Sequence, residues 1–308
     1  MKTEKKLTIC IPTYNRLKFI KKQLVFFKNE FKNNELLAKH VEFIVADNAS
    51  ADSTADFLLQ YKNENIFFKF VINSANLGLV GNIVNLLFLA KSEYVWFVSD
   101  DDDLKSGVVE RILEIIENNN KPEFIFLNFL VFGKKNFAGK SSLRVDSKNA
   151  ANEVFREDYG SLVLMTACVY KKRHLIELKD NTMFKWLSAP LLYSFYSCTK
   201  GPIYLTNEVW INYRHGDASD ASFKTISKLK FEEFVPILEY LPKLGFDKSE
   251  IKKTIKVFFE KQSHAHLLYN TINLTNSLRL YKYYSFKTIF KLPINIIHYL
   301  KKNHNYKP

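Results

Sequence analysis

The sequence predicts an α/β fold, with a mostly parallel sheet flanked by helices and a helical C-terminal region. Three observations support this prediction. Up to about residue 132, short apolar runs alternate with amphipathic stretches, as they do in strand–helix units. The runs are almost wholly apolar, which is typical of parallel strands buried on both faces. From about Ala221 onward, apolar residues recur at helical spacing instead.

The predicted elements follow one another at short intervals. Strands are expected at Leu7–Ile11, Val41–Ala46, Phe67–Ile72, Tyr94–Val98 and Phe124–Phe132, with a helix after each of the first four. In the second half, strands at Ser161–Tyr170 and Ile203–Tyr213 are expected to flank a helix near Leu187–Tyr196. The polar stretch Lys134–Tyr159 is expected to be a mobile loop. A boundary near Asp220 divides the chain into a domain of residues 1–220 and a basic helical region of residues 221–308.

The composition limits the class of protein. With 47% hydrophobic and 25% charged residues, the 308-residue chain is typical of a soluble globular protein, which excludes general disorder and a polytopic membrane protein. Three scattered cysteines are too few for a disulfide framework or a zinc cluster and suit a reducing compartment. The apolar run Leu7–Pro12 is too short for a signal peptide, and no uninterrupted apolar stretch reaches 18 residues. The chain is therefore expected to stay in the cytoplasm.

The positive charge of the chain is concentrated at its C-terminal end. The formal net charge is +13, and residues 261–308 contain eight Lys or Arg and no Asp or Glu. Between Tyr281 and Tyr306 these cations are interleaved with aromatic and aliphatic residues, a pattern that suits the surface of an anionic bilayer. We therefore expect peripheral contact with the inner face of the cell membrane. The alternative is a helix packed on the rest of the chain with a solvated Lys face.

Four consecutive carboxylates, Asp100 to Asp103, follow directly on the predicted strand Tyr94–Val98. Ligands of parallel sheets bind at the carboxyl ends of the strands. Because adjacent carboxylates repel one another, the run favours a divalent cation such as Mg²⁺ or Mn²⁺. Alternate residues of an extended chain point the same way, so Asp100 and Asp102 can face one site. The alternative is a solvated acidic turn that caps the next helix.

Two further polar segments end predicted strands. Asp47 lies where a carboxylate can accept hydrogen bonds from a ribose or a base. Its alternative role is a helix N-cap, which Ser50 or Asp52 can also supply. The turn Asn76-Leu77-Gly78 suits close approach of the backbone to a ligand. The sequence contains neither Gly-x-Gly-x-x-Gly nor Gly-x-x-x-x-Gly-Lys-Ser/Thr, the two common phosphate-loop motifs.

Four segments carry a family resemblance. They are Ile9-Cys10-Ile11-Pro12-Thr13-Tyr14-Asn15-Arg16, Val45 through Asp52, Asn76-Leu77-Gly78 with Asn82, and Ser99 through Leu104. In this order and spacing, over about 130 residues, they resemble the motifs of family 2 glycosyltransferases with the GT-A fold. The resemblance implies an inverting enzyme of surface-polysaccharide synthesis. Such an enzyme moves a sugar from a nucleotide-diphosphate donor to a glycan or lipid-linked acceptor, assisted by Mn²⁺ or Mg²⁺.

The resemblance also assigns roles by position. It implies that the nucleotide is bound by Pro12, Thr13, Asn15, Asp47, Asn76 and Asp100, and that Asp100 and Asp102 hold the metal. The sequence departs from the family at Asn48, where the family often has a second Asp. It also departs at Ser99 through Asp103, where four consecutive acids replace the family's Asp-x-Asp. The metal ligand could therefore be one residue earlier or later than the motif implies.

The second half carries several further candidates. In the family the general base is usually an acid shortly before the helix expected near Leu187–Tyr196. Asp180 is the nearest acid upstream and is the predicted base, with a solvated loop acid as the alternative, and Glu208 and Asp217 are further candidates for the base. Arg214 and His215 match a loop with which the family closes over the diphosphate. Arg214 is the expected phosphate contact and His215 a phosphate contact or metal ligand, and the alternative is an exposed polar turn.

Two other functions remain open at this point. A metal-dependent phosphohydrolase also uses an Asp-x-Asp strand end, but normally with a nucleophilic Asp after the first strand rather than the fourth. A nucleotide-binding or anionic-surface binding protein without turnover would account for the net charge. Nucleic acid is not an expected partner, because the motif loops are acidic and the positive charge lies in the tail.

Overall fold

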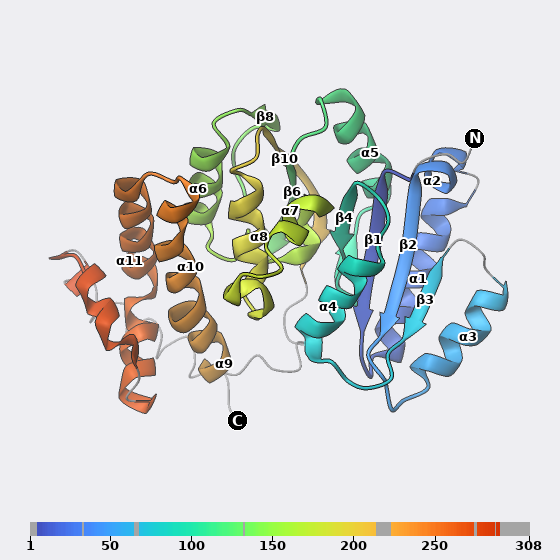
Figure 1. Cartoon of the computed structure of the whole chain (residues 1–308), viewed down its shortest axis with the longest axis horizontal. Coiled ribbons are helices and arrows are strands. Elements are labelled where there is room, and N and C mark those ends of the chain that lie inside the picture. Colours follow the sequence, from blue (N-terminus) through green and yellow to red (C-terminus); the bar gives the residue numbers. More distant parts are fainter. Residues whose placement is uncertain are drawn as a thin grey trace. The chain divides into compact units, whose positions relative to one another are not determined.

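The computed structural model describes residues 5–32, 34–64, 68–131, 133–213, 223–273, 276–286 and 288–289. The chain divides into two compact units, residues 1–217 and 218–308 (Figure 1). The boundary predicted near Asp220 falls in residues 214–222, outside the described residues.

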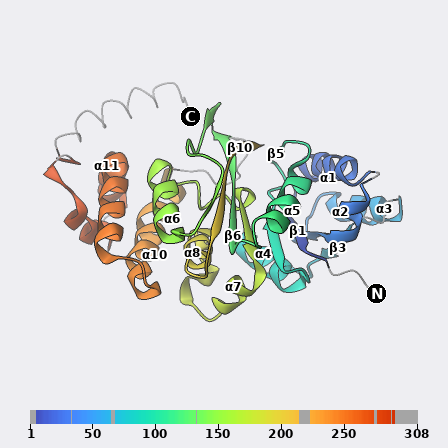
Figure 2. The same ribbon diagram turned by 90° about the horizontal axis from the view of Figure 1, so that it is seen from above.

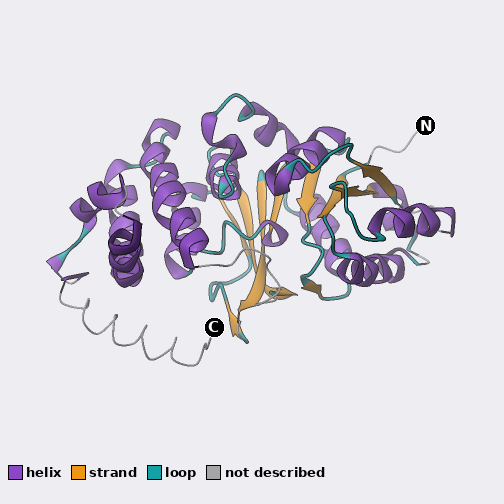
Figure 3. Cartoon of the chain, turned by 90° about the horizontal axis from the view of Figure 1, so that it is seen from below, coloured by secondary structure: helices purple, strands orange, loops and turns teal. Residues whose placement is uncertain are grey.

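The first unit is built on one ten-stranded sheet (Figures 1 and 3). Its strands are β1 (Leu7–Thr13), β2 (Val41–Asp47), β3 (Lys69–Ile72), β4 (Tyr94–Phe97), β5 (Asp103–Leu104), β6 (Phe124–Val131), β7 (Lys134–Lys135), β8 (Ser142–Arg144), β9 (Cys168–Lys171) and β10 (Ile203–Asn212). The order is β3-β2-β1-β4-β9-β6-β10-β5, with β7 beside β6 and β8 beside β10. Strands β3, β2, β1 and β4 are parallel, and so are β6 and β10, whereas β9 is antiparallel to both of its neighbours. The predicted α/β fold is confirmed, and the sheet is mixed, with antiparallel pairings of β5, β7, β8 and β9 beside the parallel ones.

Helices cover both faces of this sheet, which explains why its central strands are apolar throughout. The helices of the first unit are α1 (Leu17–Phe31), α2 (Glu35–His40), α3 (Thr54–Glu64), α4 (Gly78–Leu89), α5 (Val108–Asn118), α6 (Ser147–Glu157), α7 (Lys172–Glu177) and α8 (Ala189–Ser197). Phe27 of α1 packs on Phe43 of β2 and Trp96 of β4, with ring centroids 4.7 and 6.4 Å apart. Cys10 of β1 lies with its Sγ 4.0 Å from the Leu86 carbonyl oxygen of α4. Figure 2 shows helices on both sides of the sheet. Ile9 and Cys10 of β1 are both fully buried, so neighbouring residues of this strand, whose side chains point to opposite faces, are both covered.

The prediction of a loop at Lys134–Tyr159 is wrong. This stretch forms β7, β8 and α6. The buried face of α6 includes two alanines, Ala150 and Ala151, together with Val154 and Phe155. Its apolar stripe is therefore small and short, and it does not stand out among the polar residues around it.

The prediction of a strand at Ser161–Tyr170 is correct only in its last residues. The strand β9 begins at Cys168 and is preceded by turns and a 3₁₀ helix, Met165–Ala167. The Ser161 hydroxyl donates to the Asp158 carbonyl at 2.7 Å, and the Thr166 hydroxyl accepts the Ser99 N–H at 3.0 Å. These side chains hold local turns rather than a ladder, and a short apolar run does not distinguish the two arrangements. The predicted second-half strand and helix correspond to β10 and α8.

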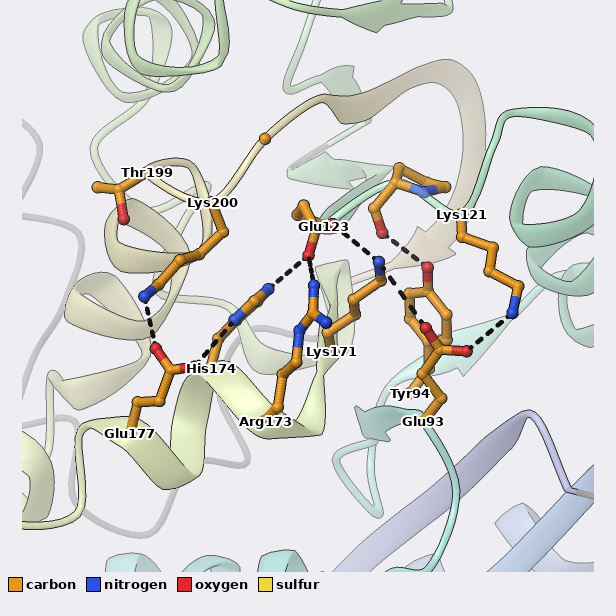
Figure 4. Close-up of polar contacts among 12 residues, drawn as sticks. Glu93, Tyr94, Lys121, Glu123, Lys171, Arg173, His174, Glu177, Thr199 and Lys200 are labelled. Atoms are coloured by element: carbon orange, nitrogen blue, oxygen red, sulfur yellow. Dashed lines mark hydrogen bonds and ion pairs between the residues drawn. The ribbon is translucent and has the colours of Figure 1, made fainter.

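A partly buried ion-pair network lies at the beginning of β4 and β6, the edge of the sheet opposite to the carboxyl ends of the parallel strands (Figure 4). Glu123 accepts from Lys171 Nζ at 2.9 Å, Arg173 Nη2 at 2.8 Å and His174 Nε2 at 2.6 Å. Burial disfavours the Glu123 carboxylate, but these hydrogen bonds outweigh burial and hold the pKa of Glu123 below its usual value. The network fixes α7 to the start of β6.

The second unit is helical, as predicted. Its elements are α9 (Phe223–Lys228), a π-helical turn (Leu229–Phe234), α10 (Val235–Tyr240), a 3₁₀ turn (Leu241–Leu244), α11 (Lys248–Asn273) and a 3₁₀ segment (Asn276–Tyr283). Two cations of the basic tail, Arg279 and Lys282, pair with Glu239 of α10 at 2.8 and 3.0 Å. Within the described parts of the chain, none of the helices has the length and apolar character needed to span a bilayer.

Candidate active site

The segments that follow β1, β2, β3 and β4 meet at the carboxyl edge of the sheet. Strand β1 continues through Pro12 to Thr13, further than the sequence predicted. The Cys10 carbonyl accepts from Val98 on the β4 side, and the Thr13 carbonyl accepts from Asn48 on the β2 side, both at 2.9 Å. Since residues alternate between sides, Pro12 directs its nitrogen toward β4 after the pairing with β4 has ended. Proline therefore costs no ladder hydrogen bond here.

Asp100 is a buried carboxylate that contacts the end of β1 and Arg16. It is 5% exposed, accepts the Thr13 hydroxyl at 2.8 Å on Oδ2, and lies 3.1 Å from Arg16 Nε through Oδ1. Burial raises the pKa of the Asp100 carboxyl to about 6, although Arg16 and Thr13 each favour its charged form. A second positive charge at this carboxylate would therefore stabilise its ionised state.

The rest of the acidic run is fixed by side chains of α1 and of its own loop. Asp101 accepts from Arg16 Nη2 and from the Ser99 hydroxyl. Asp102 is 3% exposed, and its carbonyl oxygen accepts from Gln23 Nε2, which also reaches the Ser99 carbonyl at 3.1 Å. Asp103 pairs with Lys22 near the surface. The sequence analysis did not identify Gln23, although a polar residue between the apolar positions Ile20 and Leu24 of a helix was a usable signal.

The far side of the acidic loop is attached to the end of β10. Leu104 and Asp103 pair with Ile211 and Asn212, and the Lys105 N–H donates to the Trp210 carbonyl at 2.9 Å. Burial, together with the charges of Asp102 and Asp101, raises the pKa of the Tyr213 phenol. Tyr213 therefore lies close to both carboxylates. The predicted residues Arg214 and His215 come next in the chain but lie outside the described residues.

Asp47 is fully buried and closes the turn after β2. Its two carboxylate oxygens accept the Ser50 hydroxyl at 2.5 Å and the Ser50 N–H at 3.1 Å, around Ala49 in the left-handed region at φ 60°. The Ser50 hydroxyl oxygen in turn accepts the Asn15 N–H at 2.8 Å, and the Asn15 side chain accepts the Ala51 N–H at 2.7 Å. The segments after β1 and β2 are thus joined. Asp52 bonds the N–H groups of Thr54 and Leu17, so it holds the starts of α3 and α1.

A cluster of asparagines joins the turn after β2 to the turn after β3. The Asn48 side chain donates to Asn76 Oδ1 at 2.8 Å and to the Gly78 carbonyl at 3.2 Å. Its Oδ1 accepts from Asn73 Nδ2 at 3.0 Å and from the Leu77 N–H at 2.9 Å. Two donated and two accepted bonds require an amide, because an ionised carboxylate only accepts. This arrangement gives a physical reason for Asn rather than Asp at position 48.

The acidic loop suits a divalent cation that shares its ligands with a substrate. Asp100 and Asp102 are two buried carboxylates, and hard oxygen ligands are what Mg²⁺ and Mn²⁺ prefer. In the described part of the chain, no group of three or more His, Cys, Asp or Glu side chains could hold a metal ion. A cation here would take its remaining ligands from substrate phosphates and water, as Mg²⁺ does in many phosphate sites.

The structure therefore brings most of the predicted site residues into one hydrogen-bonded assembly. It joins Thr13, Asn15, Asp47, Asn76 and Asp100 through the bonds given above, with Pro12 and Asp102 in the same segments. Asp180 is exposed in the turn after α7, and β9 leads into α7 at the start of β4, the opposite edge of the sheet. Among the described residues, no contact joins Asp180 to the assembly. Its role as the base stays a prediction from the sequence.

Comparison with known proteins agrees with this geometry. Residues 8–177 match the family model of Glycosyl transferase family 2. The chain is 25% identical over 267 residues, 84% of its length and 82% of the relative's, to a GalNAc(5)-diNAcBac-PP-undecaprenol beta-1,3-glucosyltransferase of Campylobacter jejuni.

Solved structures of low sequence identity share the fold. S. aureus TarS 1–349 in complex with UDP-GlcNAc superposes with a TM-score of 0.63 at 17% identity, covering 89% of this chain and 77% of that one. The mannosyltransferase PcManGT of Pyrobaculum calidifontis, in complex with GDP-Man and Mn²⁺, superposes with a TM-score of 0.59 at 14% identity, covering 99% and 82%. From the family match, the relatives and the fold, we conclude that the chain belongs to glycosyl transferase family 2 and is a glycosyltransferase with the GT-A fold.

Proposed function

We propose that the protein is an inverting, metal-assisted glycosyltransferase that uses a nucleoside-diphosphate sugar and a glycan or lipid-linked acceptor in surface-polysaccharide synthesis. One observation carries the proposal: two buried carboxylates, Asp100 and Asp102, lie at the carboxyl edge of a parallel sheet beside the turns after β1, β2 and β3. Further support comes from a relative named for an undecaprenol-linked substrate and from neighbours that hold UDP-GlcNAc or GDP-Man.

The nucleoside would lie over the turns that follow β1, β2 and β3. Asn15 and Asn76 are exposed on these turns and are the side chains we assign to the nucleotide's polar groups. Thr13 and Asp47 are buried, and each is engaged with a neighbouring site residue. Because Asp47 is fully buried, a direct bond from its carboxylate to a ribose would require the turn after β2 to open. In the present geometry Pro12, Thr13 and Asp47 are buried beneath the exposed turns and support them.

Transfer breaks the bond between the sugar C1 and the diphosphate and forms a bond from C1 to the acceptor oxygen. A divalent ion, when bound, stabilises the charge on the departing diphosphate, a Lewis-acid effect of several kcal/mol. We assign Asp102 and Asp100 to hold that ion. Arg214 and His215, which follow Tyr213 in the sequence, are assigned to the diphosphate. A base accepts the proton of the acceptor hydroxyl, a contribution of about 10²–10⁴ in rate, and Asp180 is the candidate from the sequence.

The basic tail would hold the enzyme at the anionic membrane where a lipid-linked acceptor lies. In support, Phe286 is 78% exposed and Ile289 56% exposed, beyond the packed 3₁₀ segment that ends at Tyr283. Exposed apolar residues among cations are typical of interfacial segments. Sedimentation with anionic liposomes tests the proposal: equal binding by the full chain and by a chain lacking residues 275–308 would contradict it.

The decisive experiment for the enzyme measures nucleotide binding by calorimetry with UDP and with GDP, each with Mn²⁺ or with EDTA. We expect one nucleotide to bind in a Mn²⁺-dependent manner and Asp102→Ala to abolish this dependence. Asp103→Ala is the matched control, because Asp103 belongs to the same run but pairs with Lys22 near the surface. Nucleotide affinity that is unchanged in Asp102→Ala and indifferent to EDTA would overturn the assignment. A screen of nucleotide sugars for Mn²⁺-dependent hydrolysis then identifies the donor.

A further inference from the structure

Arg16 is the cation that faces Asp100 and Asp101 of the acidic loop. Its Nε lies 3.1 Å from Asp100 Oδ1, and its Nη2 donates to Asp101 Oδ2 at 2.5 Å. The guanidinium also lies over the ring of Phe19, 4.4 Å from its centroid, which fixes its position from the other side. One side chain at the start of α1 therefore bridges two neighbouring carboxylates.

We propose that Arg16 is a built-in counter-cation of the acidic loop, which neutralises Asp100 and Asp101 before a divalent ion binds and competes with that ion for Asp100. This inference rests on the metal role proposed above. It assigns Arg16 a role in setting how tightly the site takes up metal.

The competition follows from the two oxygens of Asp100. Oδ2 accepts the Thr13 hydroxyl, and Oδ1 faces Arg16 Nε at 3.1 Å. A divalent ion at either oxygen would lie within a few ångströms of the guanidinium, where like charges repel strongly in a partly buried site. Metal binding must therefore displace Arg16 from Asp100 or proceed against its charge. Either route weakens the binding of a divalent ion in the absence of nucleotide. A nucleoside diphosphate, which is negatively charged, would offset the positive charge of Arg16 and strengthen that binding.

The same contact has a second consequence for the metal-free protein. Without Arg16, Asp100 and Asp101 would lose the cation that offsets their mutual repulsion. The metal-free loop would then be less stable, and added metal would stabilise the fold more than it does in the wild type. A role confined to binding the diphosphate would produce neither effect.

The test compares Arg16→Gln, Arg16→Lys and Lys22→Gln with the wild type. Lys22→Gln is the matched control, because it removes one positive charge from the same acidic run but at Asp103 near the surface. Calorimetry measures the binding of Mn²⁺ alone, and thermal unfolding is followed in EDTA and in Mn²⁺. We expect Arg16→Gln to bind Mn²⁺ about tenfold more tightly than the wild type. It should also unfold at a lower temperature in EDTA and gain more from Mn²⁺.

Arg16→Lys keeps the charge and should stay close to the wild type in Mn²⁺ affinity, and Lys22→Gln should change it by less than about twofold. An Arg16→Gln variant that binds Mn²⁺ no more tightly overturns the inference, as does an equal gain in Lys22→Gln. Unchanged Mn²⁺ affinity with a loss of UDP or GDP affinity would make Arg16 a diphosphate ligand instead. If the wild type binds no Mn²⁺ even with UDP or GDP, the proposed metal role fails together with this inference.

Discussion

Replacing Asn48 by Asp tests whether the asparagine cluster determines the identity of this residue. The family that the sequence resembles often has an acid at this position, so the exchange is conservative by that standard. In this structure Asn48 is buried and makes four hydrogen bonds, of which its Nδ2 donates two. A carboxylate oxygen in place of Nδ2 would face Asn76 Oδ1 at 2.8 Å and the Gly78 carbonyl at 3.2 Å.

The expected cost follows from these contacts. Two hydrogen bonds of about 0.5–1.5 kcal/mol each are lost, and a buried charge is set against two acceptors, so the sum is roughly 2–4 kcal/mol. For a unit of this size the unfolding temperature should fall by roughly 5–15 °C. A protonated carboxyl can donate again, so the pKa of the introduced Asp is raised in the folded state. The loss of stability is then complete above that pKa and shrinks as the pH falls through it.

Thermal unfolding of Asn48→Asp and wild type at about pH 5 and about pH 8 measures both effects. Asn149→Asp makes the same chemical change at an exposed position of α6 and should stay within about 0.5 kcal/mol of the wild type. The reasoning is refuted if Asn48→Asp is as stable as Asn149→Asp, or if its deficit is equal at the two pH values.

Two further predictions concern buried polar side chains. Gln23→Leu removes the donor of the Ser99 and Asp102 carbonyls, so calorimetry should show weaker binding of UDP or GDP with Mn²⁺, by roughly tenfold; Lys18→Leu, on the exposed face of α1, should leave affinity unchanged. Burial lowers the pKa of the His174 imidazole in the folded protein, although Glu123 opposes this shift. As the pH falls below about 6.5, the imidazole is therefore protonated in the unfolded chain before it is protonated in the folded one, and the folded state loses stability. Between about pH 7.5 and pH 5.5 the unfolding temperature should therefore fall less in His174→Gln than in the wild type, and equal falls would contradict the assignment.

The first half of the fold could be predicted from the sequence because each strand there is a short apolar run next to an amphipathic helix. Strands β1, β2, β4 and β6 begin where they were expected. The second half was predicted less well because the apolar residues there do not mark the helices and strands. Alanines form much of the buried face of α6, and the apolar residues before β9 line turns. The spacing of apolar residues indicates which side chains are buried. It identifies a helix or a strand only when the buried residues recur with the period of that element.

The candidate site divides in a similar way. The residues that follow strands could be found, because the carboxyl ends of parallel strands share one edge. The residues that support them could not, because Thr166 and Gln23 reach the acidic loop from 67 and 79 positions away through single hydrogen bonds. No local pattern marks such a pair, apart from the isolated polar position on the buried face of α1.

The four adjacent carboxylates need no metal to fold, because α1 already supplies their cations. Arg16 forms ion pairs with Asp100 and Asp101. Lys22, about two turns further along the helix, forms an ion pair with Asp103. Repulsion within the run, which first suggested a cation, is therefore relieved inside the chain. The burial of Asp100 and Asp102 beside turns that suit a nucleotide is the feature that favours a metal here. It follows that substitution of Arg16, which contacts Asp100, should alter metal affinity, whereas substitution of Lys22, which pairs with Asp103 near the surface, should change it little.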